Sequence, residues 1–191
     1  VDIVTKLFTV RALVRDHGNL HPNEVGHFLG NAGSAKFDAA CVAELTHADI
    51  TQDVDINADP VTMDNIFDAV QQIRANGEMG QLMGVVSTDV ATELMKDIQT
   101  TSYAGGDYQT EALRNGFVTR IAGVNVFQSS YMTANQATIF APAAFRIAIQ
   151  AGLDVSSAPR IAAVGTDVVA SLHAAPKLVD AARAVRIYNA A

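Results

Sequence analysis

The middle of the chain carries the pattern that most limits its fold: an amphipathic helix, then a short apolar strand, then a second amphipathic helix. Pro60 is typical of a first helical position and Gly77 of a helix end. Apolar residues recur between them at helical spacing, namely Met63, Ile66, Phe67, Val70 and Ile73. The apolar run Leu82–Val86 predicts a buried strand, and Ser87 or Thr88 begins the second helix. The core is therefore expected to combine helices with a sheet.

The remaining residues alternate between helical and strand patterns without a regular βαβ order. Helices are predicted over residues 1–15, from an N-cap at Ser34 onward, and in an alanine-rich stretch over 141–150 that has Pro142 in its first turn. Loops are predicted over 19–33 and 100–115. Strands are predicted over 51–57, 120–129 with a bulge at Gly123, 137–140, 167–172 and 183–188. This mixture favours the α+β class over a doubly wound sheet.

Composition excludes several classes of protein. The 191 residues fit one domain or two small domains that share a core, and the 49% apolar content excludes a disordered chain. No apolar stretch approaches the ~18 residues of a membrane-spanning helix. The net charge of −7 argues against electrostatic capture of nucleic acid. Because Cys41 is the single cysteine, an internal disulfide and a zinc-finger ligand set are also excluded.

Three histidines near the N-terminus are the first candidates for chemistry. His17, His21 and His27 could hold a metal ion between them, because imidazole is a common ligand. Their spacing does not match the HExxH pattern, and the segment is predicted to be irregular. Exposed loop histidines are therefore the favoured interpretation. His47 and His173 are isolated and carry no signal.

Glycines in the same segment suggest a second candidate. Gly26, Gly30 and Gly33, followed by a helix start at Ser34, could cradle an anion. The Walker and dinucleotide-binding patterns are both absent, so backbone turns are favoured. Cys41 lies on a helical apolar stripe and is interpreted as a small core residue rather than a reactive thiolate.

Acidic residues form the clearest cluster. Eight carboxylates and no Lys or Arg occur between residues 37 and 73: Asp38, Glu44, Asp49, Asp53, Asp55, Asp59, Asp64 and Asp68. The spacing of Asp53, Asp55 and Asn57 resembles the start of a calcium-binding loop. However, Ala58 stands where that loop needs Gly, and Asp64 where it needs Glu. A solvated acidic face is the favoured interpretation, with contact to a basic partner as the alternative. No catalytic, cofactor-binding or metal-ligating residue is assigned.

Residues 116–130 carry a resemblance to a known family. Their sequence, Gly-Phe-Val-Thr-Arg-Ile-Ala-Gly-Val-Asn-Val-Phe-Gln-Ser-Ser, resembles a G-x-x-x-x-IAG-x-x-V-x-x-S strand of tailed-bacteriophage major capsid proteins. The order of elements is also similar. A helix over 62–75 precedes the strand, and Ser-Thr-Asp-Val-Ala-Thr-Glu-Leu opens the next helix. An alanine-rich helix and a final Ala-Val-Arg-Ile-Tyr strand follow. The resemblance covers residues 43–188.

The resemblance implies a Hong Kong 97-type capsid fold with an axial domain and an elongated peripheral domain. The N-terminal arm and the extended loop are expected to be incomplete, in keeping with a chain that begins at Val1. The expected division is 1–80 for N-terminal helices and part of the peripheral domain, 81–165 for mainly the axial domain, and 166–191 for closing strands.

The same resemblance implies a structural shell protein rather than an enzyme. The chain would self-associate into hexamers and pentamers and form an icosahedral phage head around double-stranded DNA. It would lie in the virion and, during assembly, in the host cytoplasm. Portal, scaffolding or cement proteins are the other implied partners, and neither a cofactor nor a membrane is expected.

Two alternatives remain open from the sequence. One is a small α+β enzyme or ligand-binding domain that uses residues 26–34 and the nearby histidines. The other is an encapsulin-type compartment shell, which would enclose an enzyme in place of DNA.

Overall fold

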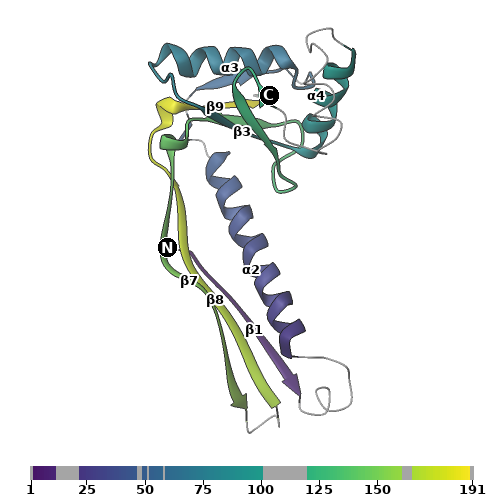
Figure 1. The fold of residues 1–191 in the computed structure, drawn as a ribbon, viewed down its shortest axis with the longest axis vertical. Helices are drawn as coiled ribbons and strands as arrows, with labels where there is room; N and C mark the ends of the chain where they lie inside the picture. The colour runs from purple at the N-terminus through teal and green to yellow at the C-terminus, as the bar shows by residue number, and fades with distance from the viewer. Residues whose placement is uncertain are drawn as a thin grey trace. The chain divides into compact units, whose positions relative to one another are not determined.

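The computed structural model describes residues 2–11, 22–46, 49–50, 52–57, 59–100, 120–160 and 165–189. The chain forms two compact units (Figure 1). Unit 1 contains Val1–Cys41 and Ile147–Pro176, and unit 2 contains Val42–Arg146 and Lys177–Ala191. Each unit draws on residues from all three stretches 1–80, 81–165 and 166–191.

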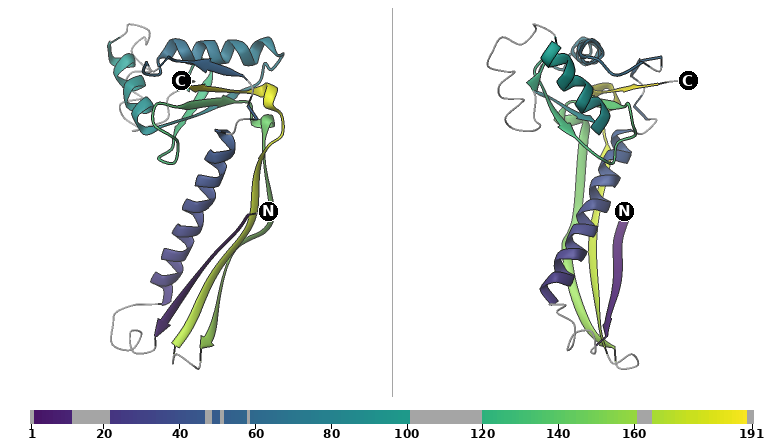
Figure 2. Two further views of the ribbon diagram at one scale, coloured as in Figure 1. Left: turned by 180° about the vertical axis from the view of Figure 1, so that it is seen from behind. Right: turned by 90° about the vertical axis from the view of Figure 1, so that its right-hand side faces the viewer.

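Unit 1 is built on a three-stranded sheet with the order β1-β8-β7. Strand β1 (Asp2–Arg11) pairs antiparallel with β8 (Gly165–Leu178), from Asp2 opposite Ala174 to Arg11 opposite Gly165. Strand β7 (Phe145–Arg160) is the opposite edge. Both views of Figure 2 show these strands as long ribbons side by side. Most of helix α2 (Pro22–Leu45) also belongs to unit 1.

The structure corrects the expectations for the N-terminal segment. The helix predicted over 1–15 is wrong, because residues 2–11 form strand β1. Their apolar residues fit helical spacing, yet many are β-branched or aromatic and suit a strand, and ten residue pairs with β8 fix it. The loop predicted over 19–33 is wrong from Pro22 onward, and the helix start at Ser34 is wrong, because both positions lie inside α2.

The alanine-rich helix predicted over 141–150 is also wrong. Only the short 3₁₀ turn η1 (Pro142–Ala144) is helical, and β7 follows it directly. Helix propensity is a weak preference that tertiary pairing overrides, and here β7 pairs with β8. The strand predicted over 167–172 lies within the longer β8.

Unit 2 is built on a six-stranded sheet with the order β2-β9-β6-β3-β5-β4. The strands are β2 (Asp53–Asp55), β3 (Leu82–Val86), β4 (Arg120–Ile121), β5 (Val124–Gln128), β6 (Ala137–Phe140) and β9 (Ala184–Tyr188). Strand β3 runs parallel to β5 and antiparallel to β6, and β9 runs parallel to β2 and antiparallel to β6. The mixed strand directions, together with the helices, confirm the predicted α+β class.

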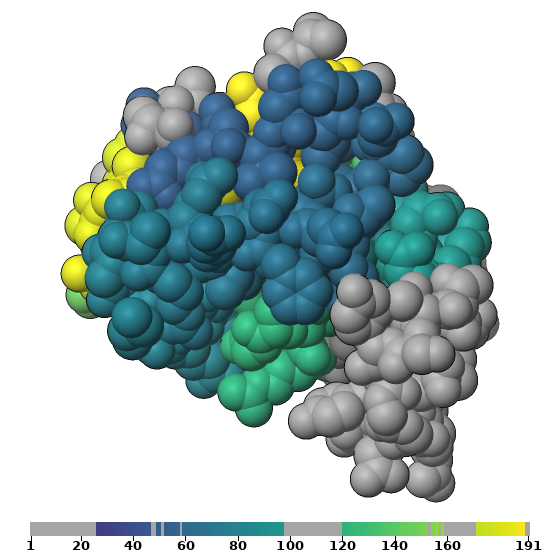
Figure 3. All heavy atoms as spheres, turned by 90° about the horizontal axis from the view of Figure 1, so that it is seen from above, coloured from purple at the N-terminus to yellow at the C-terminus, as the bar shows by residue number. Residues whose placement is uncertain are grey.

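Helices α3 (Met63–Ala75) and α4 (Thr88–Thr100) pack apolar side chains into the main core of unit 2, as the sequence predicted. Phe67 is the exception in the predicted stripe of α3, because it is 45% exposed. Every second residue of the strands packs against these helices in one apolar cluster. From the strands it includes Leu82, Val86, Ile139, Val185 and Ile187, and from the helices Ile66, Ala69, Ile73, Val90 and Leu94. In Figure 3, α3 and its neighbours, in blue and teal, cover most of the visible face, and the yellow C-terminal residues show only at margins and gaps. A smaller apolar cluster includes Leu45, Ile50, Phe140, Leu178 and Ala184.

Residues 120–128 form a tight hairpin rather than the single bulged strand that was predicted. Ile121 pairs with Val124, so Ala122 and Gly123 alone make the turn between β4 and β5. Both have positive φ, 52° and 82° respectively. This is the type I′ turn, whose twist matches that of the two strands.

Candidate functional site

The glycine segment does not form the anion cradle considered from the sequence. Gly26, Gly30 and Gly33 lie within α2, where backbone N–H groups bond along the helix, so the turn interpretation is wrong as well. His27 is exposed on α2, whereas His17 and His21 lie outside the described residues. Within the described part of the chain, no group of three or more His, Cys, Asp or Glu residues could hold a metal ion.

The eight carboxylates are distributed over α2, β2, α3 and the segments between them. Asp53 and Asp55 flank buried Val54 on β2, which confirms that their spacing reflects a strand. Glu44 and Asp49 lie 3.7 and 3.9 Å from the ammonium group of Lys177. Glu44 and Asp49 therefore share a cation of the chain itself, and Glu44 also accepts from the Leu178 N–H.

Cys41 is half-buried on α2 and is a free thiol. Burial raises its pKa, and the charge of Asp38 raises it further. The thiol is therefore protonated near neutral pH and is a poor nucleophile.

One polar cluster joins β2 to β9. The guanidinium group of Arg186 donates to both carboxylate oxygens of Asp53, at 3.0 and 3.2 Å, and to the backbone oxygen of Thr46. The same group lies 4.5 Å from the ring centre of Tyr188, whose hydroxyl lies 3.3 Å from Asp53. A cation held between a carboxylate and an aromatic ring fixes the edge strand β2 in register.

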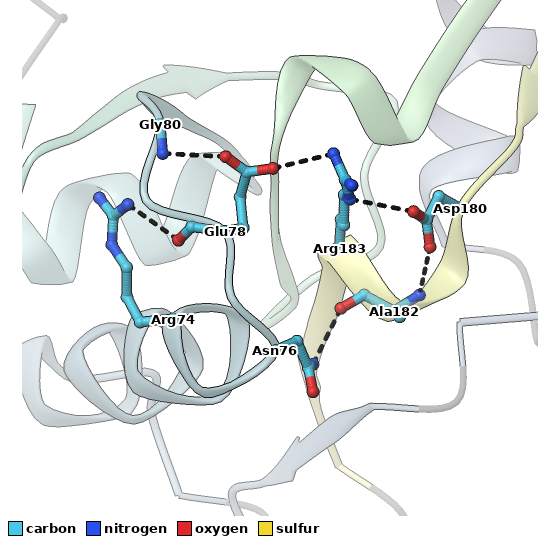
Figure 4. Close-up of polar contacts among 7 residues, drawn as sticks. All are labelled: Arg74, Asn76, Glu78, Gly80, Asp180, Ala182 and Arg183. Carbon is cyan, nitrogen blue, oxygen red and sulfur yellow. Dashed lines mark hydrogen bonds and ion pairs between the residues drawn. The ribbon is translucent and has the colours of Figure 1, made fainter.

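A second polar cluster joins the segment before β3 to the 3₁₀ turn η3 (Ala181–Arg183), which precedes β9 (Figure 4). Glu78 accepts from Arg183 at 3.0 Å and from the Gly80 N–H at 2.8 Å. Arg183 also lies 3.0 Å from Asp180. The backbone of Glu78 accepts from Arg74. The side chain of Glu78 is mostly buried, so these bonds are partly shielded from water.

A third cluster is centred on Asn135, whose φ is 54°. Its side chain accepts from the Val61 N–H and donates to the Asp59 oxygen, while its own N–H donates to Asp89 at 2.6 Å. It therefore links the segment before α3 to the first turn of α4.

The pKa of Asp89 lies below its ordinary value. Burial is the largest single influence and raises the pKa, but hydrogen bonding to the carboxylate outweighs it. The contributors are the Ser87 side chain and the backbone N–H groups of Asn135, Asp89 and Val90. The Ser87 hydroxyl oxygen has no partner at hydrogen-bonding distance among the described residues, so we attribute most of the effect to the N–H groups.

All three clusters connect elements of unit 2 to one another. In each cluster the charged groups contact other groups of the same chain, so the clusters stabilise the fold of this unit. No local sequence motif marks these clusters, so they could not be predicted from the sequence. No helix among the described residues is long and apolar enough to cross a bilayer.

The chain is similar to known proteins in structure. No protein-family sequence model matches the chain, and no curated protein matches it by sequence. A structure from Mycobacterium phage Che8 matches with a TM-score of 0.82 and 18% identity, covering 97% of this chain and 70% of that one. The capsid of the cyanophage P-SCSP1u matches with a TM-score of 0.79 and 14% identity, over 99% and 72% of the two chains.

The chain has the Hong Kong 97-type capsid fold. This confirms the fold that was implied by the sequence resemblance over residues 43–188. The holo-SrpI encapsulin of Synechococcus elongatus PCC 7942 also matches, with a TM-score of 0.77 and 9% identity, over 97% of this chain and 72% of that one. The capsid fold is therefore common to structures described as phage capsids and as an encapsulin.

Proposed function

We propose that this protein is the structural subunit of a phage head, a shell protein that self-assembles around double-stranded DNA. The observation that carries the proposal is the likeness in fold to phage structures, with a TM-score of 0.82 over 97% of the chain. Several of the similar structures are described as capsids, among them those of a cyanophage, the bacteriophage PhiM1, a Ralstonia phage and an empty GTA particle.

The composition is compatible with a container. A subunit with a net charge of −7 gains little by binding phosphate groups, so enclosed DNA would be held without sequence-specific contacts. Assembly would rest on many repeated contacts between copies, arranged as hexamers and pentamers. Portal, scaffolding or cement proteins would be the other partners, and the protein would lie in the virion after assembly in the host cytoplasm.

We further propose a correspondence between the two units and the domains of the fold. Unit 2 contains most of residues 81–165 and would form the axial domain. Unit 1 contains part of residues 1–80 and would belong to the peripheral domain. The closing strands within 166–191 would serve both.

The experiment is to purify the protein under native conditions and image it by electron microscopy, with sedimentation to measure the mass of the assemblies. Closed particles of uniform diameter are expected. A protein that stays monomeric at every concentration would contradict the shell proposal.

An encapsulin-type compartment is the second candidate, favoured by the match to the Synechococcus encapsulin. The particle contents distinguish the two. After external nuclease treatment, protected DNA would support a phage head, and a co-purifying enzyme inside the particle would support a compartment.

A further inference from the structure

Strand β7 has the features of a contact surface. It is an edge of the three-stranded sheet, so among the described residues it pairs only with β8. It is 16 residues long, and a strand edge of that length presents a row of backbone N–H and C=O groups that another chain could pair with.

The side chains of β7 add an apolar face. Ile147, Ile149 and Val155 are 46%, 64% and 43% exposed. Their odd spacing places them on the same face of the strand. Ile147 and Ile149 follow one another on that face, and Val155 lies further along it. Exposed apolar residues grouped on one face mark surfaces that contact another molecule.

The other sheet shows how an edge strand is normally protected. Strand β2 has only three residues, and two of them are Asp53 and Asp55. Short length and charge discourage pairing with other chains. In β7, Asp154 is the single charged residue between Ile147 and Ala158, and no Pro or Lys occurs in that stretch. The chain therefore protects the whole of β2. In β7, Arg146, Pro159 and Arg160 stand only at the two ends of the strand, and its middle is left open.

We propose that β7, through the apolar face of Ile147, Ile149 and Val155, is the surface on which a second copy of this chain docks. The inference rests on the proposed function, in which each copy needs contact surfaces for its neighbours. The charge distribution supports a second copy as the occupant. Two chains that each carry −7 repel one another least where both surfaces are almost uncharged. A basic partner, in contrast, would be drawn to the acidic surfaces and not to β7.

The test uses the whole protein and two matched double variants. The substitutions Ile147→Lys and Ile149→Lys place two charges on the apolar face. Ala148→Lys and Gln150→Lys place the same charges on the opposite face of the same strand, at positions that are also exposed. Particle formation is followed by sedimentation and imaging, and folding by circular dichroism.

The Ile variant is expected to lose particle formation while remaining folded, and the control is expected to assemble. Particles that the Ile variant forms as readily as the wild type would overturn the inference alone. Equal loss in both variants would also overturn it, because the effect would not be specific to the apolar face. A wild-type chain that never assembles would instead contradict the proposed function.

Hydrogen exchange on the unmodified protein provides a second measurement that does not depend on how the variants fold. Amides of residues 147–156 are expected to exchange more slowly in particles than in dissociated subunits. Unchanged exchange over this stretch would overturn the inference.

Discussion

Arg183 Nη1 lies 3.0 Å from Glu78 Oε2, although the two residues are 105 positions apart in the sequence. Glu78 directly precedes the loop into β3, and Arg183 directly precedes β9. Both strands pair with β6, one on each side. The contact therefore holds together the entry points of the two strands that flank β6.

Removing this carboxylate is expected to destabilise unit 2. Glu78→Ala should lower the free energy of unfolding by about 1–2 kcal/mol, because it leaves the Gly80 N–H without its side-chain acceptor and Arg183 with Asp180 alone. Urea unfolding measures the change. Glu93→Ala is the matched control: its pair with Lys96 is exposed on α4 and should contribute no more than about 0.5 kcal/mol. Equal losses in the two variants would contradict the structural role of Glu78.

Asp89 should make stability depend on pH in the acid range. Its folded-state pKa is lowered, so the folded protein binds fewer protons than the unfolded chain there. The stability it contributes is present above the unfolded-state value of about 3.9 and is lost as pH falls through the lower folded-state pKa. Asp89→Asn should therefore have a lower free energy of unfolding than wild type at about pH 7. The difference in unfolding free energy between the two proteins should become smaller below about pH 4. Parallel curves of unfolding free energy against pH would count against this assignment.

Two substitutions at Asn135 should separate hydrogen bonding from backbone conformation. Asn135→Gly keeps the positive φ accessible but removes the bonds to Asp59 and Val61, which should cost about 1–2 kcal/mol. Asn135→Ala should cost about 1 kcal/mol more, because alanine is strained in this region. Thermal and urea unfolding of the three proteins measure both steps. A glycine variant as stable as the wild type would exclude a contribution from the side-chain bonds.

The elements that the sequence predicted correctly are those whose apolar pattern lies within a single helix or a single strand. The segment over α3 combines apolar residues at helical spacing with a polar start. Thr62 is the N-cap and donates to the side chain of Asn65, so the helix begins at Met63, three residues later than Pro60 suggested. Strand β3 is apolar throughout because residues at both faces are buried or half-buried. Local pattern and tertiary structure agree at these positions, so single-sequence reasoning succeeds.

The failures occur where distant residues decide the structure. Ile147 and Ile149 alternate as in a strand, but nearby alanines and Pro142 favour a helix, and only pairing with β8 resolves the ambiguity. The polar clusters show the same limit, since Asn135 and Asp59 are 76 positions apart. The fold class and the capsid likeness were accessible because the order of elements survives such local errors.

The hairpin turn between β4 and β5 provides a last test, because its two residues share one backbone conformation but differ in side chain. Ala122, with φ at 52°, has a Cβ in the left-handed region, and its side chain is exposed. Ala122→Gly should therefore raise the free energy of unfolding by about 0.5–1 kcal/mol, since strain is relieved and no packing is lost.

Gly123→Ala should act in the opposite direction and lower the free energy of unfolding by about 1 kcal/mol or more. A Cβ at Gly123 would meet no atom within 4 Å, so this loss would arise from the φ of 82° and not from a clash. Urea unfolding of both variants beside the wild type measures the two changes. The type I′ geometry requires changes of opposite sign, and two changes of the same sign would show that the turn adopts another conformation.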